Sequence, residues 1–414
     1  MARGVFVTAV VLVASIRLML FSISPRPRSG ANSSAKSQPV SFTNESGLAR
    51  GERSPEVSLN LTSLPGEGLM EIFTRLALML NDREATIIHL TVFGCVSASA
   101  AGTEAMRRIF GRILWPVTWV EGASCAENPI AGLQVFALTR GEVNHIELDG
   151  CVVGSVFESG AARHCVLGGL VPAQILLPRA EQTRRTLDLL QQALAQAGFS
   201  LADTVRTWFF LDDILAWYDE FNRARSQIYS GVKFSSGSLP ASTGVGASNP
   251  SGAALALSAW AAKSLQGSAE AVEVASPLQC PAPAYGSSFS RAMEIPSASG
   301  RRLFISGTAS IAPGGQTLWP GDAAKQIALT MAVVEAILQA RGCDFSDVTR
   351  ATAYFKHHAD APVFAEWCVA RGLDSLPVVA AQCAVCRDDL LFELEADAWR
   401  NTDCESYEQK KVSR

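Results

Sequence analysis

An internal repeat constrains this fold more than any other feature of the sequence. Residues 194–213 (LAQAGFSLADTVRTWFFLDD) match residues 338–357 (LQARGCDFSDVTRATAYFKH) at a constant offset of 144. Matched positions include Gly198 with Gly342 and Arg206 with Arg350, and further along Leu239-Pro240 corresponds to Leu376-Pro377 after the second copy is shortened by seven residues. The chain of 414 residues is long enough for several domains, so two copies of one unit account for much of it.

Both copies predict the same order of elements: strand, helix, strand, helix, strand, strand. The first strand is expected over 151–157 in one copy and over 302–311 in the other. Apolar residues at helical spacing then predict a long helix in each copy. Gly198 and Gly342 follow these helices, where a helix end favours a left-handed residue. The predicted fold class is α/β (α+β), with helices packed on one face of each sheet.

The remaining segments set the expected domain boundaries. Residues 1–44 contain no acidic residue and include the apolar run 5–16, which is typical of a signal peptide, signal anchor or transit segment. A misassigned start codon or a simple membrane anchor is the alternative. Residues 45–135 do not match the repeat and predict a further α/β region. The other boundaries are 136–265 for the first unit, 266–286 for a linker, 287–400 for the second unit and 401–414 for a polar tail.

Composition argues against several classes of function. The net charge is −4 and the basic residues are scattered, so we expect no nucleic-acid binding. The ten cysteines are irregularly spaced, which favours buried free thiols over a disulfide framework. No His or Cys set has the spacing of metal ligands, so we expect no metal.

Three carboxylates line one face of the last predicted strand, within CRDDLLFELEADAW (386–399). At period two, Glu393, Glu395 and Asp397 alternate with apolar residues. When Ala398-Trp399 is aligned with Ala259-Trp260, the first copy has Ala254 and Ala256 in place of Glu393 and Glu395. If the fold needed these carboxylates for its structure, we would expect them in both copies. We therefore favour a functional role for Glu393 and a solvated sheet face for Glu395 and Asp397.

The repeat unit resembles the RidA (YjgF) family, whose order of elements it shares. The tandem pair, with six motifs in order, resembles more narrowly the chorismatase family. These motifs occupy residues 206–225, 239–246, 287–292, 306–311, 320–322 and 386–395.

The resemblance implies a pseudo-trimeric arrangement of RidA-like units with ligand clefts between them. It also implies hydrolysis of the enolpyruvyl ether of chorismate to pyruvate, without a cofactor. The second product is a dihydroxycyclohexadiene carboxylate or a hydroxybenzoate, depending on the subgroup. The family's catalytic acid corresponds to Glu393. A thiol at Cys386 resembles the hydroxybenzoate-forming subgroup, although a buried small hydrophobic residue is an equal alternative.

Protonation of an enol ether needs an acid that is still protonated near neutral pH, and burial raises the pKa of a Glu. The substrate carboxylates need cations, and arginine donates two parallel hydrogen bonds to a carboxylate. The candidates are Arg206, Arg291 and Arg350. Ser242, Thr243 and Gly244 are further candidates, since hydroxyls and an exposed backbone suit a ligand. Arg225 is expected on a solvated helix face and Arg387 at a solvated hairpin turn.

The sequence departs from the chorismatase pattern around 312–322 (APGGQTLWPGD). Gly315 or a neighbour and Trp319 stand where the family has histidines. Two other functions therefore remain open: a non-catalytic small-molecule-binding protein and a RidA-type imine deaminase. The expected partner is a small dicarboxylate, with a homo-oligomer possible. Chorismate is made in the cytosol of bacteria and in the plastids of plants and algae. The resemblance therefore makes the N-terminal segment compatible with plastid import.

Overall fold

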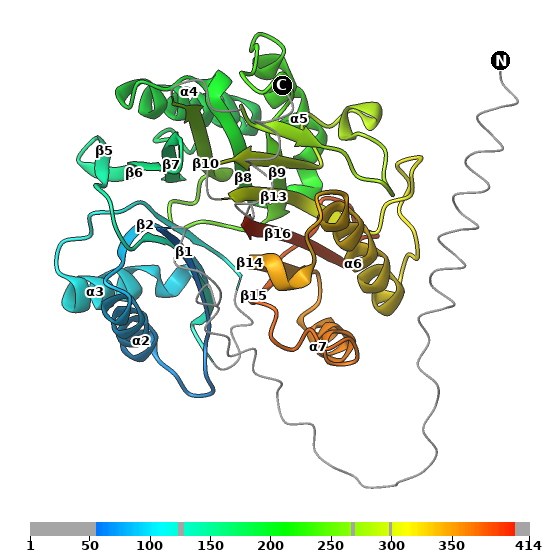
Figure 1. Ribbon diagram of the computed structural model, residues 1–414, viewed down its shortest axis with the longest axis horizontal. Helices are drawn as coiled ribbons and strands as arrows, with labels where there is room; N and C mark the ends of the chain where they lie inside the picture. Colours follow the sequence, from blue (N-terminus) through cyan, green and yellow to red (C-terminus); the bar gives the residue numbers. More distant parts are fainter. Residues whose placement is uncertain (1–54, 123–127, 266–269, 298–299, 402–414) are drawn as a thin grey trace, which may run out of the picture.

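The computed structural model describes residues 55–122, 128–265, 270–297 and 300–401. These residues form three sheets, with helices on the outer faces and the sheets facing one another inside (Figure 1). The predicted fold class is confirmed. The expected targeting segment and all but the first residue of the expected polar tail lie outside the described residues.

The first sheet has the strand order β1-β4-β2-β3 and comes from the N-terminal region. Its chain order is strand, helix, strand, helix, strand, strand, which is the order of the repeated unit. The expected α/β region is thus a third unit with the topology of the repeat, although its residues do not match the repeat. Its elements are β1 (Glu56–Thr62), α2 (Leu69–Asp82), β2 (Thr86–Gly94), α3 (Ser99–Phe110), β3 (Val117–Val120) and β4 (Ile130–Leu138).

The second sheet has the order β5-β6-β7-β10-β8-β9 and carries α4 and α5. Its last four strands, in sheet order, correspond to the four strands of the first sheet. Its elements are β5 (Asn144–Leu148), β6 (Cys151–Ser159), β7 (Ala162–Leu170), α4 (Arg179–Gln196), β8 (Thr204–Leu211), α5 (Ile214–Tyr229), β9 (Ala241–Gly246) and β10 (Leu255–Ser264).

The third sheet repeats this arrangement in the order β11-β12-β13-β16-β14-β15. Its first strand, β11 (Val272–Val274), lies in the segment 266–286, for which the sequence predicts only a linker. The other elements are β12 (Ala292–Pro296), β13 (Gly300–Ala309), α6 (Ala323–Ala340), β14 (Val348–Phe355), α7 (Ala361–Val369), β15 (Val378–Gln382) and β16 (Phe392–Asn401). The apolar helix α6 has the length and composition of a membrane span, but half of it is buried against the sheet.

The two strands expected to begin the repeat are not equivalent in the structure. The expected strand over 151–157 is β6, whereas the expected strand over 302–311 is β13. The two sheet orders pair β7 with β13 and β6 with β12. The sequence does not predict β7 because the pair Gly168-Gly169 interrupts its apolar pattern. The predicted helix ends are confirmed: Gly198 and Gly342 have φ of 71° and 66°.

A central core holds the three units together. Each sheet packs one face on its own helices, and the opposite faces meet in a common cluster. Phe93, Phe210 and Tyr354 occupy this centre, with ring centroids 6.2 Å apart for Phe93 and Phe210 and 6.1 Å apart for Phe93 and Tyr354. They lie on the equivalent strands β2, β8 and β14. The predicted pseudo-trimeric arrangement follows from these three equivalent contributions.

This equivalence corrects the alignment of the last strand of each unit. Phe210 pairs with Ala256, and Tyr354 pairs with Glu393. Ala256 is therefore the counterpart of Glu393, and Ser258 is the counterpart of Glu395. The alignment through Ala259-Trp260 is wrong by two residues. Because two residues keep the same face of a strand, the inference that the first copy lacks these carboxylates still holds.

In the first unit the position equivalent to Glu393 is Gly132, which pairs with Phe93. One of the three equivalent positions thus carries an acid.

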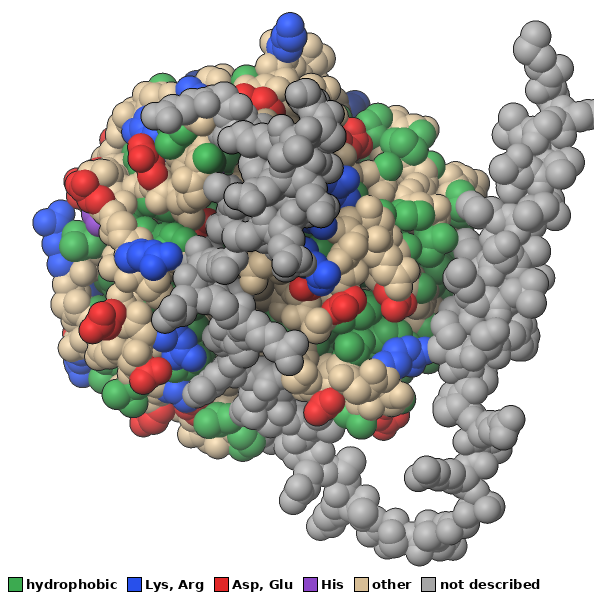
Figure 2. All heavy atoms as spheres, in the orientation of Figure 1, with side chains coloured by type: hydrophobic (Ala, Val, Ile, Leu, Met, Phe, Trp, Pro, Cys, Tyr) green, Lys and Arg blue, Asp and Glu red, His purple; other side chains and the backbone are tan. Residues whose placement is uncertain are grey.

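Cys95 is disulfide-bonded, so the expectation of free thiols fails at this position. On the face shown in Figure 2, acidic and basic side chains are interspersed wherever grey atoms do not cover them.

Candidate functional site

A cavity of about 1190 Å³ lies between the two repeated units. One wall comes from α5 and β9 of the second sheet. The other comes from β13, β16 and the short helix Ala282–Tyr285 of the third. An isolated bridge between Ala241 and Ser290 joins the two units here. The cavity is therefore at the kind of junction that the resemblance predicts.

Glu393 stands in the wall of this cavity, with 4% of its surface exposed. Its carboxyl lies against the backbone of Gly307, in an irregular stretch of β13 between Ile305 and Thr308. A methyl group on Gly307 would come within 2.0 Å of Glu393 Oε1. The glycine of the SGTASI motif thus makes room for the acid.

The Glu393 carboxyl has no hydrogen bond or ion pair with any residue that the structure describes. Burial and the nearby carboxylate of Glu395 raise its pKa to about 8, against opposing effects of Arg206 and Arg291. Glu393 is therefore mainly protonated at neutral pH and faces a cavity. A carboxyl of this kind is suited to act as a general acid.

Glu395 and Asp397 are fully buried, so the prediction that they lie on a solvated sheet face is wrong. The face is enclosed because it packs against the neighbouring unit. Glu395 Oε2 accepts hydrogen bonds from Arg206 (2.6 Å) and Thr243 (2.5 Å). Glu395 Oε1 accepts from Arg350 (2.5 Å) and Thr352 (3.0 Å).

Arg206 and Arg350 are committed to this buried network and do not line the cavity. Arg350 also pairs with Asp397 at 2.9 Å. Thr243 is likewise behind the wall, where its hydroxyl accepts hydrogen bonds from Arg206 (2.6 Å) and from the amide of Gly307 (3.0 Å). The structure thus places three of the predicted substrate-binding residues in the support of the site.

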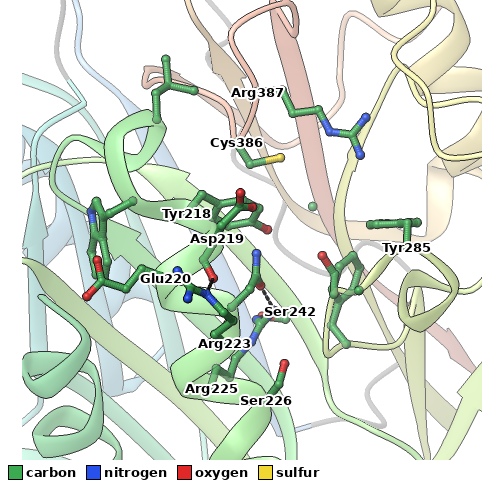
Figure 3. A pocket seen from close by; sticks show the side chains of 18 of the residues that line it. Tyr218, Asp219, Glu220, Arg223, Arg225, Ser226, Ser242, Tyr285, Cys386 and Arg387 are labelled. Carbon is green, nitrogen blue, oxygen red and sulfur yellow. Dashed lines mark hydrogen bonds between the residues drawn. The ribbon is translucent and has the colours of Figure 1, made fainter.

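Arg225 lies in the cavity wall with 2% of its surface exposed, so the prediction of a solvated helix residue is wrong. It donates to Asn222 Oδ1 at 2.7 Å and to Ser242 Oγ at 3.4 Å (Figure 3). Within the described part of the chain it has no carboxylate partner, and its Nε is buried without a hydrogen bond. A buried cation of this kind is costly unless an anion pairs with it.

Arg291 is the second such cation, and here the prediction and the structure agree in placing it at the cavity. It is 3% exposed, and its Nε donates to the carbonyl of Cys280 at 3.1 Å. Its Nη2 is buried without a hydrogen bond. The guanidinium lies over the rings of Tyr285 and Phe289. Among the described residues, no carboxylate forms an ion pair with it.

Side chains from both units complete the cavity. Tyr285 faces Arg225 and Tyr218 from the opposite side, with Cys386 and Arg387 at the far end (Figure 3). Burial and Glu393 raise the pKa of Cys386 to about 12, so its thiol is protonated and unsuited to nucleophilic attack. Arg387 is half-buried and donates to the carbonyl of Gly315 at 2.6 Å, which corrects its expected exposure.

Ser242 and Gly244 also line the cavity, as predicted from LPASTGVG. Tyr218 and Tyr285 are not among the predicted site residues, and the predicted solvent exposure of Arg225 is wrong. Tyr218 and Arg225 are both in the stretch YDEFNRAR that carries the resemblance, so the signal is present. Tyr285 is in the segment predicted as a linker and gives no signal. Among the described residues, no group of three or more His, Cys, Asp or Glu is placed to hold a metal.

Comparison with known proteins now gives the family. The model of the family described as endoribonuclease L-PSP matches residues 163–256 and 281–399, which together are more than half of the chain. The chain belongs to this family.

Two individual matches extend the comparison. The chain is 27% identical over 242 residues to a 3-hydroxybenzoate synthase of Streptomyces hygroscopicus, covering 52% of this chain and 68% of that protein. A crystal structure of a chorismatase aligns with 84% of this chain and all of its own, with a TM-score of 0.56 and 19% identity. These two matches support the resemblance to chorismatases, and the solved structure shares the fold of this chain over most of its length.

Proposed function

We propose that this protein is a hydrolase that cleaves the enolpyruvyl ether of chorismate and releases pyruvate. The observation that carries the proposal is Glu393, an unpaired carboxyl with a pKa raised to about 8, in a cavity that also holds two arginines without carboxylate partners among the described residues. The similarity to a 3-hydroxybenzoate synthase and to a chorismatase points to the same substrate.

The chemistry needs one proton donor and two anion sites. Glu393 transfers its proton to the methylene carbon of the enol ether, which leaves an oxocarbenium ion. Water adds to this ion, and the hemiketal collapses to pyruvate and the ring alcohol. The carboxylate of Glu393 recovers a proton in the course of water addition, so the enzyme ends as it began. A positioned general acid contributes roughly 10²- to 10⁴-fold in rate.

Arg225 and Arg291 are the residues we assign to the two substrate carboxylates. Each is buried, each carries a permanent charge, and each has donor atoms without partners among the described residues. A dianion that reached both would satisfy two buried cations at once, and charge-assisted hydrogen bonds to carboxylates are among the stronger ones. Ser242 and the backbone at Gly244 add polar groups to the same wall. Cys386 forms part of the wall as a neutral thiol.

The test is release of pyruvate from chorismate by the purified full chain, followed with a coupled assay beside the Glu393→Gln variant. We expect turnover by the parent and a loss of roughly 10²-fold or more in the variant. Glu335→Gln, which changes an exposed carboxylate on α6, serves as the control. Binding of chorismate without pyruvate would instead indicate a non-catalytic binding protein. Release of ammonia from imines without pyruvate would indicate a deaminase.

A further inference from the structure

We propose that Glu395 is a positioning residue for Glu393. The carboxylate of Glu395 pairs with both Arg206 and Arg350 behind the cavity, so that neither arginine pairs with Glu393 and Glu393 can carry the proton. This inference rests on the proposed function in giving Glu393 the role of general acid.

The balance of charges behind the cavity is the first argument. Three carboxyl groups alternate along β16, and two arginines lie among them. The contacts assign both arginines to the two carboxyls farther from the cavity. Arg206 pairs with Glu395 at 2.6 Å, and Arg350 pairs with Glu395 at 2.5 Å and with Asp397 at 2.9 Å. No cation in this network remains for Glu393.

The geometry of Glu395 is the second argument, because it prevents exchange of partners. Each of its two oxygens accepts one hydrogen bond from an arginine and one from a threonine, all from buried groups. The donors come from β8 and β9 of the second sheet and from β14 of the third. For Arg206 to turn toward Glu393, it would have to leave a charged carboxylate and the hydroxyl of Thr243. The network therefore holds Glu395 in its ionised form at a fixed place.

The distance between the two glutamates is short enough for this charge to matter. They are two residues apart on one strand face, roughly 7 Å along the strand. Two like charges at that distance in a protein interior repel each other appreciably. In agreement, burial opposes ionisation of Glu395, but Arg350 and Arg206 outweigh it and lower its pKa. The pKa of Glu393 is raised by burial and then by Glu395.

Other charged and titratable groups also face Glu393, and their effects set the sign of the test. Arg206 and Arg291 favour its ionised form. Removing the charge of Glu395 leaves these cations, together with Arg350, less compensated. The groups around Glu393 are Arg206 from β8, Tyr354 from β14, Tyr218 and Arg225 from α5, Arg291 before β12, and Cys383, Cys386 and Arg387 before β16.

The experiment measures the protonation of Glu393 directly, without substrate. The full chain is labelled with ¹³C at the glutamate side-chain carboxyls, and the Glu393 signal is assigned by its loss in Glu393→Gln. We expect Glu395→Gln to lower the titration midpoint of Glu393 by about one pH unit or more. Glu395→Asp keeps the charge and should leave the midpoint close to that of the parent. Arg206→Gln removes a cation and should raise it.

A folded Glu395→Gln protein whose Glu393 midpoint does not fall would overturn the proposal, since a purely structural role predicts loss of stability alone. If thermal melting shows that Glu395→Gln does not fold, Arg206→Gln decides: a raised midpoint supports the proposal, and an unchanged or lowered one overturns it. The basic limb of the pH profile for pyruvate release should move with the midpoint. If chorismate is not turned over at all, the proposed function fails, whereas the titration still tests the role of Glu395.

Discussion

Two junctions between neighbouring units use the same construction, but one carries charge and the other does not. At the junction beside the cavity, Thr243 accepts a hydrogen bond from the amide of Gly307 and contacts Arg206 and Glu395. At the junction of the first and second units, Thr118 accepts from the amide of Gly169 at 2.8 Å. There the equivalents of Arg206, Glu395 and Glu393 are His89, Ser258 and Ala256.

The junction of the first and second units is held by neutral groups. The ring of His89 lies 3.0 Å from Thr118 Oγ1, and Thr118 Oγ1 lies 2.7 Å from Ser258 Oγ. A methyl group on Gly168 would come within 2.3 Å of His89 Nε2, so the ring fills this space. Burial lowers the pKa of His89 to about 3, which keeps the imidazole uncharged. Neutral hydrogen bonds are sufficient to hold two units together here.

This difference indicates that the charges at the junction beside the cavity have a role other than holding the units together. If the fold needed these charges, the junction of the first and second units would need them too. Buried ion pairs contribute little stability relative to neutral packing, because desolvation offsets their attraction. The scaffold therefore supplies the threonine and the glycine, and the charged residues serve the cavity. The following variants test this division, beginning with the largest expected effect.

Gly307→Ala should remove most of the activity without unfolding the protein. The added methyl group would come within 2.0 Å of Glu393 Oε1, and the carboxyl must move away to admit it. Displacement of a general acid costs roughly 10²-fold or more in rate. The measurement is kcat for pyruvate release, with a thermal melt to check folding.

Gly231→Ala is the control, because Gly231 is exposed outside the lining of the cavity and its methyl group would meet only the carbonyl oxygen of Ile228, at 3.6 Å. Equal losses of activity in the two variants would contradict the placing of Glu393 against Gly307.

Glu393 should contribute a fall in stability as the pH rises from about 4.5 to about 8, and the difference in stability between the parent and Glu393→Gln should show this fall. The pKa of Glu393 is about 8 in the folded chain against a usual value of 4.5, so within this window the folded state holds a proton that the unfolded state has lost. A difference of one pH unit between the folded and unfolded pKa corresponds to about 1.4 kcal/mol, so the fall in unfolding free energy amounts to a few kcal/mol.

Urea unfolding of both proteins at several pH values measures this slope. Parallel curves for the parent and for Glu393→Gln would show that Glu393 is already ionised in the folded state. His89 at the other junction contributes a slope of the opposite sign below about pH 6.5, because its pKa is lowered, but this contribution is the same in both proteins and cancels in their difference.

Arg225→Met should weaken substrate binding and raise stability together. The guanidinium is buried without a carboxylate partner among the described residues, so its removal relieves a desolvation cost in the free protein. We expect KM for chorismate to rise roughly 10-fold or more, from the loss of a charge-assisted hydrogen bond. We expect the unfolding free energy to rise by about 1 kcal/mol.

Arg107→Met, on the exposed face of α3 and outside the lining of the cavity, should change neither quantity by much. A fall in stability in Arg225→Met with KM unchanged would make Arg225 a structural residue.

The repeat, the order of its elements and the acid are predictable from the sequence, because these depend on local periodicity and on one strand face. Gly198, Gly342 and Glu393 are of this kind. The third copy of the unit, at residues 56–138, is not predictable in this way, since topology is kept there without matching residues. Sequence alone also does not distinguish a solvated face from one buried by another unit. The predictions for Glu395, Asp397 and Arg225 fail for that reason, as their burial depends on contacts between units.

The smallest expected effect compares the two threonines directly. Thr118→Val and Thr243→Val each keep the shape of the side chain and remove the hydroxyl that accepts from a glycine amide. Each should cost about 1–2 kcal/mol of unfolding free energy, because a buried amide loses its partner. Thr118→Val should leave pyruvate release unchanged, since Thr118 lies at the other junction and does not line the cavity of Glu393. Thr243→Val should also lower kcat, because it frees the backbone of Gly307 on which Glu393 rests.

Chemical unfolding and steady-state rates for the two variants complete the comparison. If both lower kcat alike, then activity depends on general rigidity of the junctions rather than on the support of Glu393. If neither does, the hydrogen bond from Gly307 to Thr243 has no part in holding the acid, and the bulge in β13 must fix it alone. If only Thr243→Val lowers kcat, the two otherwise equivalent junctions differ in function because of the residues that surround Thr243.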